Sequence, residues 1–160
     1  MLGEGGIGLV YGGASVGLMG QLADAALQCG AEVIGVIPER LVARELAHRS
    51  LTELKVVGSM HARKALMAEL SDAFIALPGG YGTLDELFEA VTWAQLGLHA
   101  RPIVLLNSEG FYDPLLAAIR HASAEGFIAS SQLALLRVAP TPRAALDLIA
   151  STAPPLPTSD

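Results

Sequence analysis

The sequence contains little cysteine, few aromatic residues and little charge. Cys29 is the only cysteine among 160 residues, so an internal disulfide and a metal site built on several cysteines are both excluded. Aromatic residues make up 5% of the chain and charged residues 16%, whereas 52% of the residues are hydrophobic. This composition supplies a sizeable core for a single domain and excludes wholesale disorder.

The sequence also lacks the segments that carry a chain into or across a membrane. Its longest run without a charged residue, 5–23, is long enough to span a bilayer, but seven of its residues are glycine. A transmembrane helix is therefore not expected, and no basic segment precedes an apolar run as in a signal peptide. We expect a cytoplasmic protein without a membrane partner.

Positive charge is also in short supply. The 16 acidic residues outnumber the 10 basic ones, which gives a formal net charge of −6 at pH 7. A nucleic-acid partner is not expected, because neutralising a phosphate backbone needs clustered Lys and Arg. Small anions can still bind, since backbone amides at helix N-termini hold them without net positive charge. No set of His, Asp and Glu has the spacing of metal ligands, so we expect no metal.

Short β-type runs alternate with helical stretches along the chain. Strands are expected at 7–11, 32–37, 53–57, 73–77, 103–106 and 136–138, and helices at 16–28, 60–70, 83–96, 114–125 and 142–149. Apolar strands separated by helices predict an α/β fold, a Rossmann-like, doubly wound parallel sheet with helices on both faces. We expect a single domain over 1–150 and a Pro-rich tail over 151–160.

Two glycine-rich loops each lead from an expected strand into an expected helix. In doubly wound sheets, ligands bind beyond the carboxyl ends of the strands, where such loops lie. In the first glycine loop (residues 12–20), Gly13, Ser15 and Gly17 form a candidate phosphate loop. It is not a Walker A motif, because Gly17 is followed by Leu18 rather than by lysine.

Other interpretations of the first glycine loop are open. Gly13, Ser15 and Gly17 have the spacing of a hydrolase nucleophile elbow, although this pattern is short. Asp113 and His121 follow in the order that a catalytic triad of this kind requires. Alternatively, Ser15 caps the following helix, or the loop is a tight turn without a ligand.

The second glycine loop (residues 78–83) has three glycines in four positions. Backbone N–H groups in such a loop are free at the positive end of the following helix, where they could hold a phosphate together with the Thr83 hydroxyl. The alternative is structural: Thr83 and Glu86 have the Thr-x-x-Glu spacing of a capping box. The spacing alone favours the capping box.

Arg63 is expected on the apolar side of a helix. Helical spacing places it on one face with Met60, Met67 and Leu70. An arginine there needs an anionic partner, because burying an unpaired charge is costly. Helical side chains lean toward the N-terminus, so its guanidinium should point to the ligand side of the sheet. The partner is either a structural carboxylate or a bound phosphate.

These motifs together resemble the Lonely Guy (LOG) family. The matching segments are Ser-Met-His-Ala-Arg-Lys at 59–64, Ala-Leu-Pro-Gly-Gly-Tyr-Gly-Thr-Leu-Asp-Glu at 76–86 and Thr-Trp-Ala-Gln-Leu-Gly at 92–97. Further matches, in the same order as in the family, are 10–13, 17–20, 33–38 and 102–107. The resemblance extends to about residue 127 and is far more specific than a single glycine-rich loop.

The resemblance implies a cytokinin riboside 5′-monophosphate phosphoribohydrolase. Such an enzyme hydrolyses the N-glycosidic bond of an N6-substituted adenosine monophosphate to the free base and ribose 5-phosphate, with no metal or organic cofactor. By the family motif, Arg63 and Glu86 are the catalytic pair of a nucleotide-binding domain. The implied nucleotide contacts are Glu45, Lys64, Gly80, Tyr81, Gly82, Thr83, Leu84, Asp85 and Thr92. Members of the family are homodimers, some of which assemble further into hexamers.

The chain departs from the family pattern at its front. The family has an additional strand and a Gly/Ser-rich loop before the segment that matches 10–13. That strand is central in a doubly wound sheet, so its absence would leave two neighbouring strands with unpaired backbone groups. Two other functions are open: a broader nucleosidase acting on AMP and related nucleotides, and a non-catalytic protein of the same fold that binds a nucleotide or a pterin cofactor.

Overall fold

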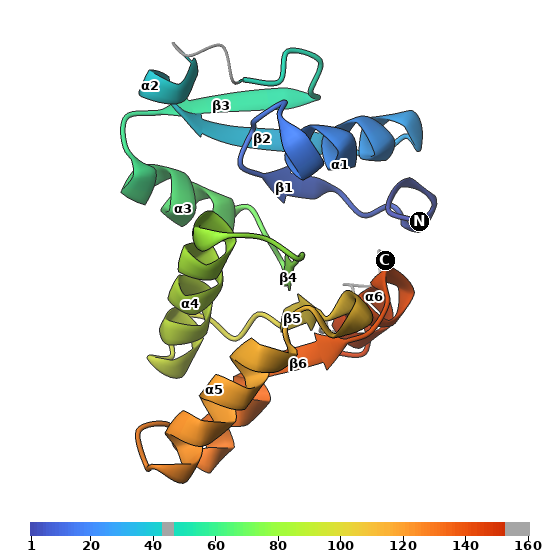
Figure 1. Ribbon diagram of the computed structural model, residues 1–160. Coiled ribbons are helices and arrows are strands. Elements are labelled where there is room, and N and C mark those ends of the chain that lie inside the picture. Colours follow the sequence, from blue (N-terminus) through green and yellow to red (C-terminus); the bar gives the residue numbers. More distant parts are fainter. Residues whose placement is uncertain (43–46, 153–160) are drawn as a thin grey trace, which may run out of the picture. The chain divides into compact units, whose positions relative to one another are not determined.

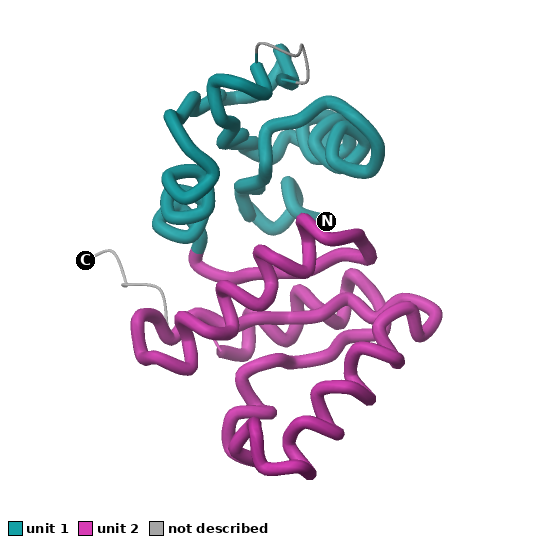
Figure 2. Tube along the Cα trace, turned by 60° about the vertical axis from the view of Figure 1, so that its left-hand side comes forward, with its two compact units in different colours: residues 1–71 teal, residues 72–160 magenta. Residues whose placement is uncertain are grey.

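A computed structural model describes residues 1–42 and 47–152 of the chain. The chain divides into two compact units, Met1–Ser71 (unit 1) and Asp72–Asp160 (unit 2), which Figure 2 shows in different colours. Each unit contains a three-stranded parallel sheet with helices beside it (Figure 1). The predicted α/β class with parallel strands is therefore confirmed.

Unit 1 has the sheet order β1-β2-β3. Its elements are η1 (Gly3–Gly5), β1 (Leu9–Tyr11), α1 (Gly17–Gln28), β2 (Val33–Pro38), α2 (Glu39–Val42), β3 (Glu53–Val57) and α3 (Met60–Glu69). Its core cluster consists of Tyr11, Ala23, Ala26, Ala31 and Val33. The small residues Ala23 and Ala26 are the buried alanines of α1 and let this helix pack closely on the sheet, and the loop between β1 and α1 lies against the carboxyl end of β2.

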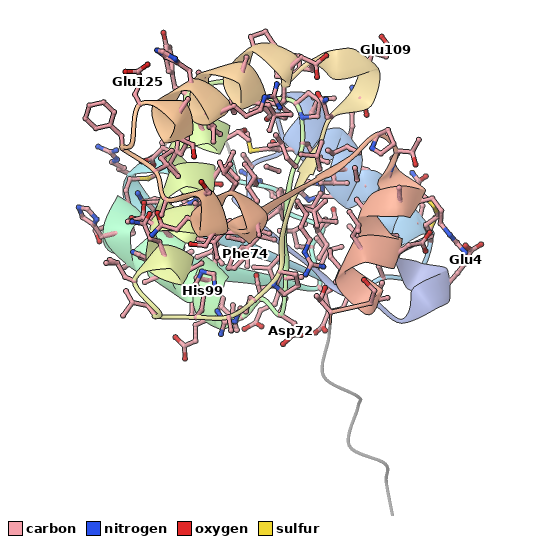
Figure 3. All side chains as sticks on the ribbon, turned by 90° about the horizontal axis from the view of Figure 1, so that it is seen from below. Glu4, Asp72, Phe74, His99, Glu109 and Glu125 are labelled. Atoms are coloured by element: carbon pink, nitrogen blue, oxygen red, sulfur yellow. The ribbon has the colours of Figure 1, made fainter. Side chains whose placement is uncertain are left out.

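Unit 2 has the sheet order β4-β5-β6. Its elements are β4 (Phe74–Ala76), α4 (Tyr81–Gln95), β5 (Ile103–Leu106), η2 (Ser108–Gly110), α5 (Asp113–Ala124), η3 (Ser130–Leu135), β6 (Leu136–Ala139) and α6 (Pro142–Ala150). All four residues of the central strand β5 are buried. At the edge of this core, the rings of Phe74 and His99 lie 5.3 Å apart (Figure 3).

The sheet differs from the predicted one in its continuity. One doubly wound sheet was expected, whereas the structure has two parallel sheets of three strands. Within residues 1–42 and 47–152, β1 pairs with β2 alone and β4 pairs with β5 alone. In the described part of the chain, β1 and β4 therefore each have one edge without a paired strand.

The strands and helices lie close to their predicted positions. The strand at 53–57 and the strand at 103–106 have the predicted bounds. The main difference is α4, which begins at Tyr81 rather than at Thr83 because Gly80, in an extended conformation, is the N-cap residue. The predicted tail lies mostly beyond the described part of the chain, which ends at residue 152. In that described part, no helix combines the length and the hydropathy needed to cross a bilayer.

Candidate active site

The first glycine loop packs directly on Arg63. A Cβ atom at Gly12 would overlap Nη2 of Arg63, so only glycine fits here without a shift. The next residue, Gly13, has φ +71°, and a Cβ there would lie 3.2 Å from the backbone nitrogen of Val36. The adjacent glycines of this loop are thus accounted for by the close approach of β2 and Arg63.

Arg63 is buried, as its place on the apolar face predicts. Its side chain comes from the first turn of α3, whose N-cap Ser59 accepts a hydrogen bond from the backbone N–H of Ala62 at 3.1 Å. Arg63 is 8% exposed, and its Nε donates to the carbonyl oxygen of Val36 at 3.1 Å. The guanidinium therefore reaches the carboxyl ends of β1 and β2, the ligand side of the sheet. A backbone carbonyl was not among the predicted partners.

The proposed roles of Ser15 have different outcomes. The N-cap residue of α1 is Val16, whose side chain makes no capping hydrogen bond, so Ser15 is not the N-cap residue of this helix. The nucleophile elbow is wrong as well. Asp113 accepts a hydrogen bond from Asn107 at 2.8 Å, and His121 lies eight residues further along α5, about 12 Å away. An Asp–His pair cannot form at that distance, whereas a phosphate contact of Ser15 stays a prediction.

The capping-box interpretation of the second glycine loop is also wrong. Thr83 is the third residue of α4 and not its N-cap, so the Thr-x-x-Glu spacing has no capping geometry. The Thr83 hydroxyl instead lies against Gly79, where it occupies the place of a Cβ. No described atom comes within 4 Å of a Cβ built on Gly80 or Gly82. The Cβ positions of these two glycines therefore face open space, next to the first turn of α4, whose N–H groups have no acceptor within the helix.

The strand end that leads into the second glycine loop is fixed by Tyr112. This tyrosine is 2% exposed, and its hydroxyl donates to the carbonyl oxygen of Leu77 at 2.5 Å. Its own backbone N–H donates to Oδ1 of Asn107 at 2.7 Å. Burial raises the pKa of the Tyr112 hydroxyl, so the phenol keeps its proton and stays a donor. The loop thus starts from a rigid position.

A shallow groove runs along α4. Its lining residues are Tyr81, Leu84, Asp85, Phe88, Glu89, Thr92 and Trp93. Four of them, Tyr81, Leu84, Asp85 and Thr92, are predicted nucleotide contacts, which the structure thus brings to one helix face. Phe88, Glu89 and Trp93 were missed. Phe88 and Glu89 lie three or four residues from predicted contacts, so helical spacing would have found them, and Trp93 lies four residues beyond Glu89.

The remaining predicted site residues fall in three places. Lys64 follows Arg63 on α3 in unit 1, and Glu86 lies half-buried on α4 in unit 2. Glu45 lies outside the described residues. The pairing of Arg63 with Glu86, which belong to different units, stays a prediction. Among the residues that the structure describes, no group of three or more His, Cys, Asp or Glu side chains could hold a metal ion.

The chain is similar to a family of enzymes and to two solved structures. The family described as "Possible lysine decarboxylase" matches residues 19–149. A cytokinin riboside 5′-monophosphate phosphoribohydrolase from Rhodococcoides fascians is 65% identical over 121 residues, 75% of this chain and 61% of that protein. Its counterpart from Oryza sativa subsp. japonica is 55% identical over 140 residues, 88% of this chain and 58% of that protein. The chain thus spans about three fifths of the length of these relatives.

The two solved structures are those of a molybdenum cofactor binding protein and a molybdenum cofactor carrier protein. A molybdenum cofactor binding protein from Rippkaea orientalis has a TM-score of 0.69 at 25% identity, covering 94% of this chain and 80% of its own. The molybdenum cofactor carrier protein from Chlamydomonas reinhardtii has a TM-score of 0.66 at 23% identity, covering 94% and 79%. The second likeness shows the fold alone.

Proposed function

The chain belongs to the Lonely Guy (LOG) family, and from that membership we propose that it hydrolyses cytokinin riboside 5′-monophosphates. Water adds across the N-glycosidic bond: its hydroxyl goes to C1′ of the ribose, and its proton goes to the leaving base. The products are ribose 5-phosphate and an N6-substituted adenine. The identity of 55–65% to relatives that carry this name supports the proposal.

The open N-terminus of α4 is the structural observation that carries the proposal furthest. Gly80 and Gly82 have no packing reason to be glycine, and their backbone adjoins open space. A phosphate placed there would be held by amide N–H groups and by the positive end of a 15-residue helix. The groove that continues along the same helix offers Leu84, Phe88 and Trp93, apolar side chains suited to a base and its hydrophobic substituent.

Glu86 and Arg63 supply the chemistry in this proposal. Breaking the N-glycosidic bond builds positive charge on the ribose, as in glycoside hydrolysis. A carboxylate beside C1′ stabilises that charge and can orient or deprotonate the attacking water, which is the role we assign to Glu86. Arg63 holds phosphate or ribose oxygens and fixes the substrate. Neither role needs a metal or an organic cofactor.

The other predicted contacts belong to this proposal as well. We assign nucleotide binding to the loop and groove residues Gly80, Tyr81, Gly82, Thr83, Leu84, Asp85 and Thr92, and to Lys64 and Glu45. Gly13, Ser15 and Gly17 are assigned to a phosphate-side loop. We further propose a cytoplasmic homodimer, which the resemblance to the family supports.

Release of free base tests the proposal. The protein is incubated with isopentenyladenosine 5′-monophosphate or with AMP, and the free base is measured by liquid chromatography. We expect base from the isopentenyl substrate at a much higher rate. Equal rates on the two substrates would replace the selective function with a broader nucleosidase, and no base from either would overturn the hydrolase function.

Glu86→Gln separates binding from catalysis. It removes the negative charge and keeps the shape, so we expect nucleotide affinity within a factor of about three and turnover lower by at least about 100-fold. The matched control is Glu125→Gln, which removes an exposed carboxylate after the end of α5 (Figure 3). Turnover of the Glu86 variant equal to that of the control would remove Glu86 from the mechanism.

A second candidate function is binding of a pterin cofactor without hydrolysis. The likeness to the Rippkaea orientalis protein, at 25% identity and a TM-score of 0.69, favours it. It would be supported if neither nucleotide is cleaved and the protein retains molybdenum cofactor on gel filtration. The much higher identity to the phosphoribohydrolases makes this the weaker candidate.

A further inference from the structure

His48 is buried in unit 1 with both ring nitrogens in use. It is 7% exposed, its Nε2 lies 3.1 Å from Oδ1 of Asp24 on α1, and its Nδ1 accepts a hydrogen bond from the backbone N–H of Ser50 at 3.2 Å. Because Nδ1 is an acceptor, the proton of the neutral ring is on Nε2 and is donated to Asp24. This arrangement fixes the segment 47–50 to α1, and none of the proposed catalytic roles involves it.

The backbone of the same segment is attached to the first glycine loop. The N–H of His48 donates to the carbonyl oxygen of Gly13 at 2.9 Å, and Ala47 forms an antiparallel bridge with Ala14. The carbonyl oxygen of Ala14 also accepts the hydroxyl of Tyr11, at 3.2 Å. The turn at residues 12–15 is therefore held on one side by β1 and on the other by the segment that His48 anchors.

The turn at residues 12–15 limits where the Arg63 guanidinium can lie. Gly12 lies against Nη2, and on the other side Nε is bonded to the Val36 carbonyl of β2. A displacement of the turn would open space beside Nη2, so the position of the guanidinium would be less restricted on that side. The chain of contacts from Asp24 through His48 and Gly13 to Arg63 lies wholly within unit 1.

We propose that His48 and Asp24 are positioning residues, which hold the turn at 12–15 against Arg63 and thereby orient its guanidinium for the substrate. The part that concerns the substrate rests on the proposed function. Leu51 and Thr52 also attach the same segment to the unit, through packing on its core and through a hydrogen bond from the N–H of Val33 to Thr52 Oγ1 at 2.9 Å. We therefore expect an effect of about tenfold, as for one hydrogen bond.

Two substitutions of His48 distinguish the hydrogen bond of Nε2 from that of Nδ1. His48→Gln keeps an N–H donor at the position of Nε2, whereas His48→Asn keeps only an acceptor near the position of Nδ1. Asp24→Ala removes the acceptor of the Nε2 proton. If the hydrogen bond to Asp24 positions the turn, His48→Gln behaves as the wild type. His48→Asn and Asp24→Ala then show the same defect, and the double variant is no worse than either single variant.

The first measurement is the Nε–Hε signal of Arg63 in a nitrogen–proton correlation spectrum of the full chain, assigned by its loss in Arg63→Lys. We expect hydrogen exchange at this site to be about tenfold faster in His48→Asn and Asp24→Ala, and unchanged in His48→Gln. His99 provides the matched control. Its Nδ1 accepts the N–H of Arg101 at 3.2 Å and its Nε2 lies 3.0 Å from the Ala90 carbonyl in unit 2, so His99→Asn should leave the Arg63 signal unchanged.

The second measurement is kcat and KM for isopentenyladenosine 5′-monophosphate. We expect kcat/KM to fall about tenfold in His48→Asn and Asp24→Ala and less than about twofold in His48→Gln. An Arg63 signal unchanged in both defective variants, with only the thermal midpoint lowered, overturns the proposal and leaves a structural role. A changed Arg63 signal with unchanged kcat/KM overturns the role in catalysis. A wild type without turnover overturns the proposed function instead, while the Arg63 signal still decides whether the turn is held by His48.

Discussion

The first glycine loop in unit 1 and the second in unit 2 both lead from a strand into a helix, but their glycines have different surroundings. In the first, Gly12, Gly13 and Gly20 each face atoms that a Cβ would crowd, from Arg63, from β2 and from the Ser15 carbonyl. In the second, Gly79 alone is crowded, by Thr83, and Gly80 and Gly82 adjoin open space. Packing thus accounts for Gly12, Gly13 and Gly20, and the left-handed backbone at φ +60° accounts for Gly17, whereas neither reason applies to Gly80 and Gly82.

This difference separates structural from functional glycines. A glycine whose missing side chain makes room for the protein itself is required for folding, and its replacement acts on stability. Gly80 and Gly82 face open space without a positive φ, and they lie at the N-terminus of a long helix, so a ligand that approaches the backbone is the reason that we propose for these two glycines. The following predictions are ordered by expected size, and each tests one side of this comparison.

Gly20→Ala should give the largest effect. Its Cβ would overlap the backbone carbonyl group of Ser15, which cannot move without shifting the first glycine loop, so we expect the free energy of unfolding to fall by about 3 kcal/mol. Urea unfolding followed by circular dichroism measures the change. Gly58→Ala is the control in the same unit, since no described atom lies within 4 Å of its Cβ position. Equal stability of the two variants would show that the first loop is not crowded.

Gly82→Ala should give the opposite pattern. It is the second residue of α4, where alanine is favoured over glycine, so we expect unfolding to cost up to about 0.5 kcal/mol more than in the wild type. At the same time the methyl group would stand where we propose that the phosphate meets the backbone, and AMP affinity should fall about tenfold by calorimetry. Unchanged affinity would count against a phosphate at this loop.

The smallest expected effect concerns alkaline pH. Tyr11 braces the first loop, and burial, with a smaller contribution from the negative charge of Asp24, raises the pKa of its hydroxyl from the ordinary value of 10.0 to about 12. Above pH 10 the unfolded chain releases this proton and the folded chain retains it. The stabilising contribution is therefore complete below pH 10 and is lost as the pH rises toward 12.

Tyr11→Phe isolates this contribution from the other titrating groups. The difference in unfolding free energy between wild type and variant should be constant from pH 7 to about 9.5 and shrink between pH 10 and 12. Urea unfolding at several pH values gives the difference directly. A difference that stays constant through pH 12 would mean that the hydroxyl is not buried as the structure has it.

Local patterns predicted the elements and part of the candidate site. Helical spacing predicted that Arg63 would be buried, and alternation of strands and helices predicted the α/β class. The start of α4 was misplaced because Thr-x-x-Glu is the usual signal for a helix start, whereas here Gly80 precedes the first turn. The Thr-x-x-Glu motif fits both a capping box and a ligand site, and only the observed start of α4 excludes the capping box.

Contacts between residues far apart in sequence could not be predicted. Arg63 bonds to the carbonyl of Val36, and every residue carries a carbonyl, so no residue type signals this partner. His48 and Asp24 are 24 residues apart, and neither belongs to a motif. The close approach of Gly12 to Arg63 likewise depends on the packing of α3 against β2. Sequence periodicity describes the faces of one helix or strand, whereas these contacts form between different elements.

The hydroxyl of Thr92 has a consequence for the kind of ligand atom that the groove can accept. Its proton is donated to the carbonyl oxygen of Phe88, at 2.7 Å, within α4. Toward a ligand the oxygen therefore offers only lone pairs. A ligand N–H group at this point gains a hydrogen bond, whereas a ligand carbonyl meets an oxygen and is repelled. If a base lies there, as we propose, one with an amino group would be favoured over one with a keto group by the direction in which a single hydroxyl points.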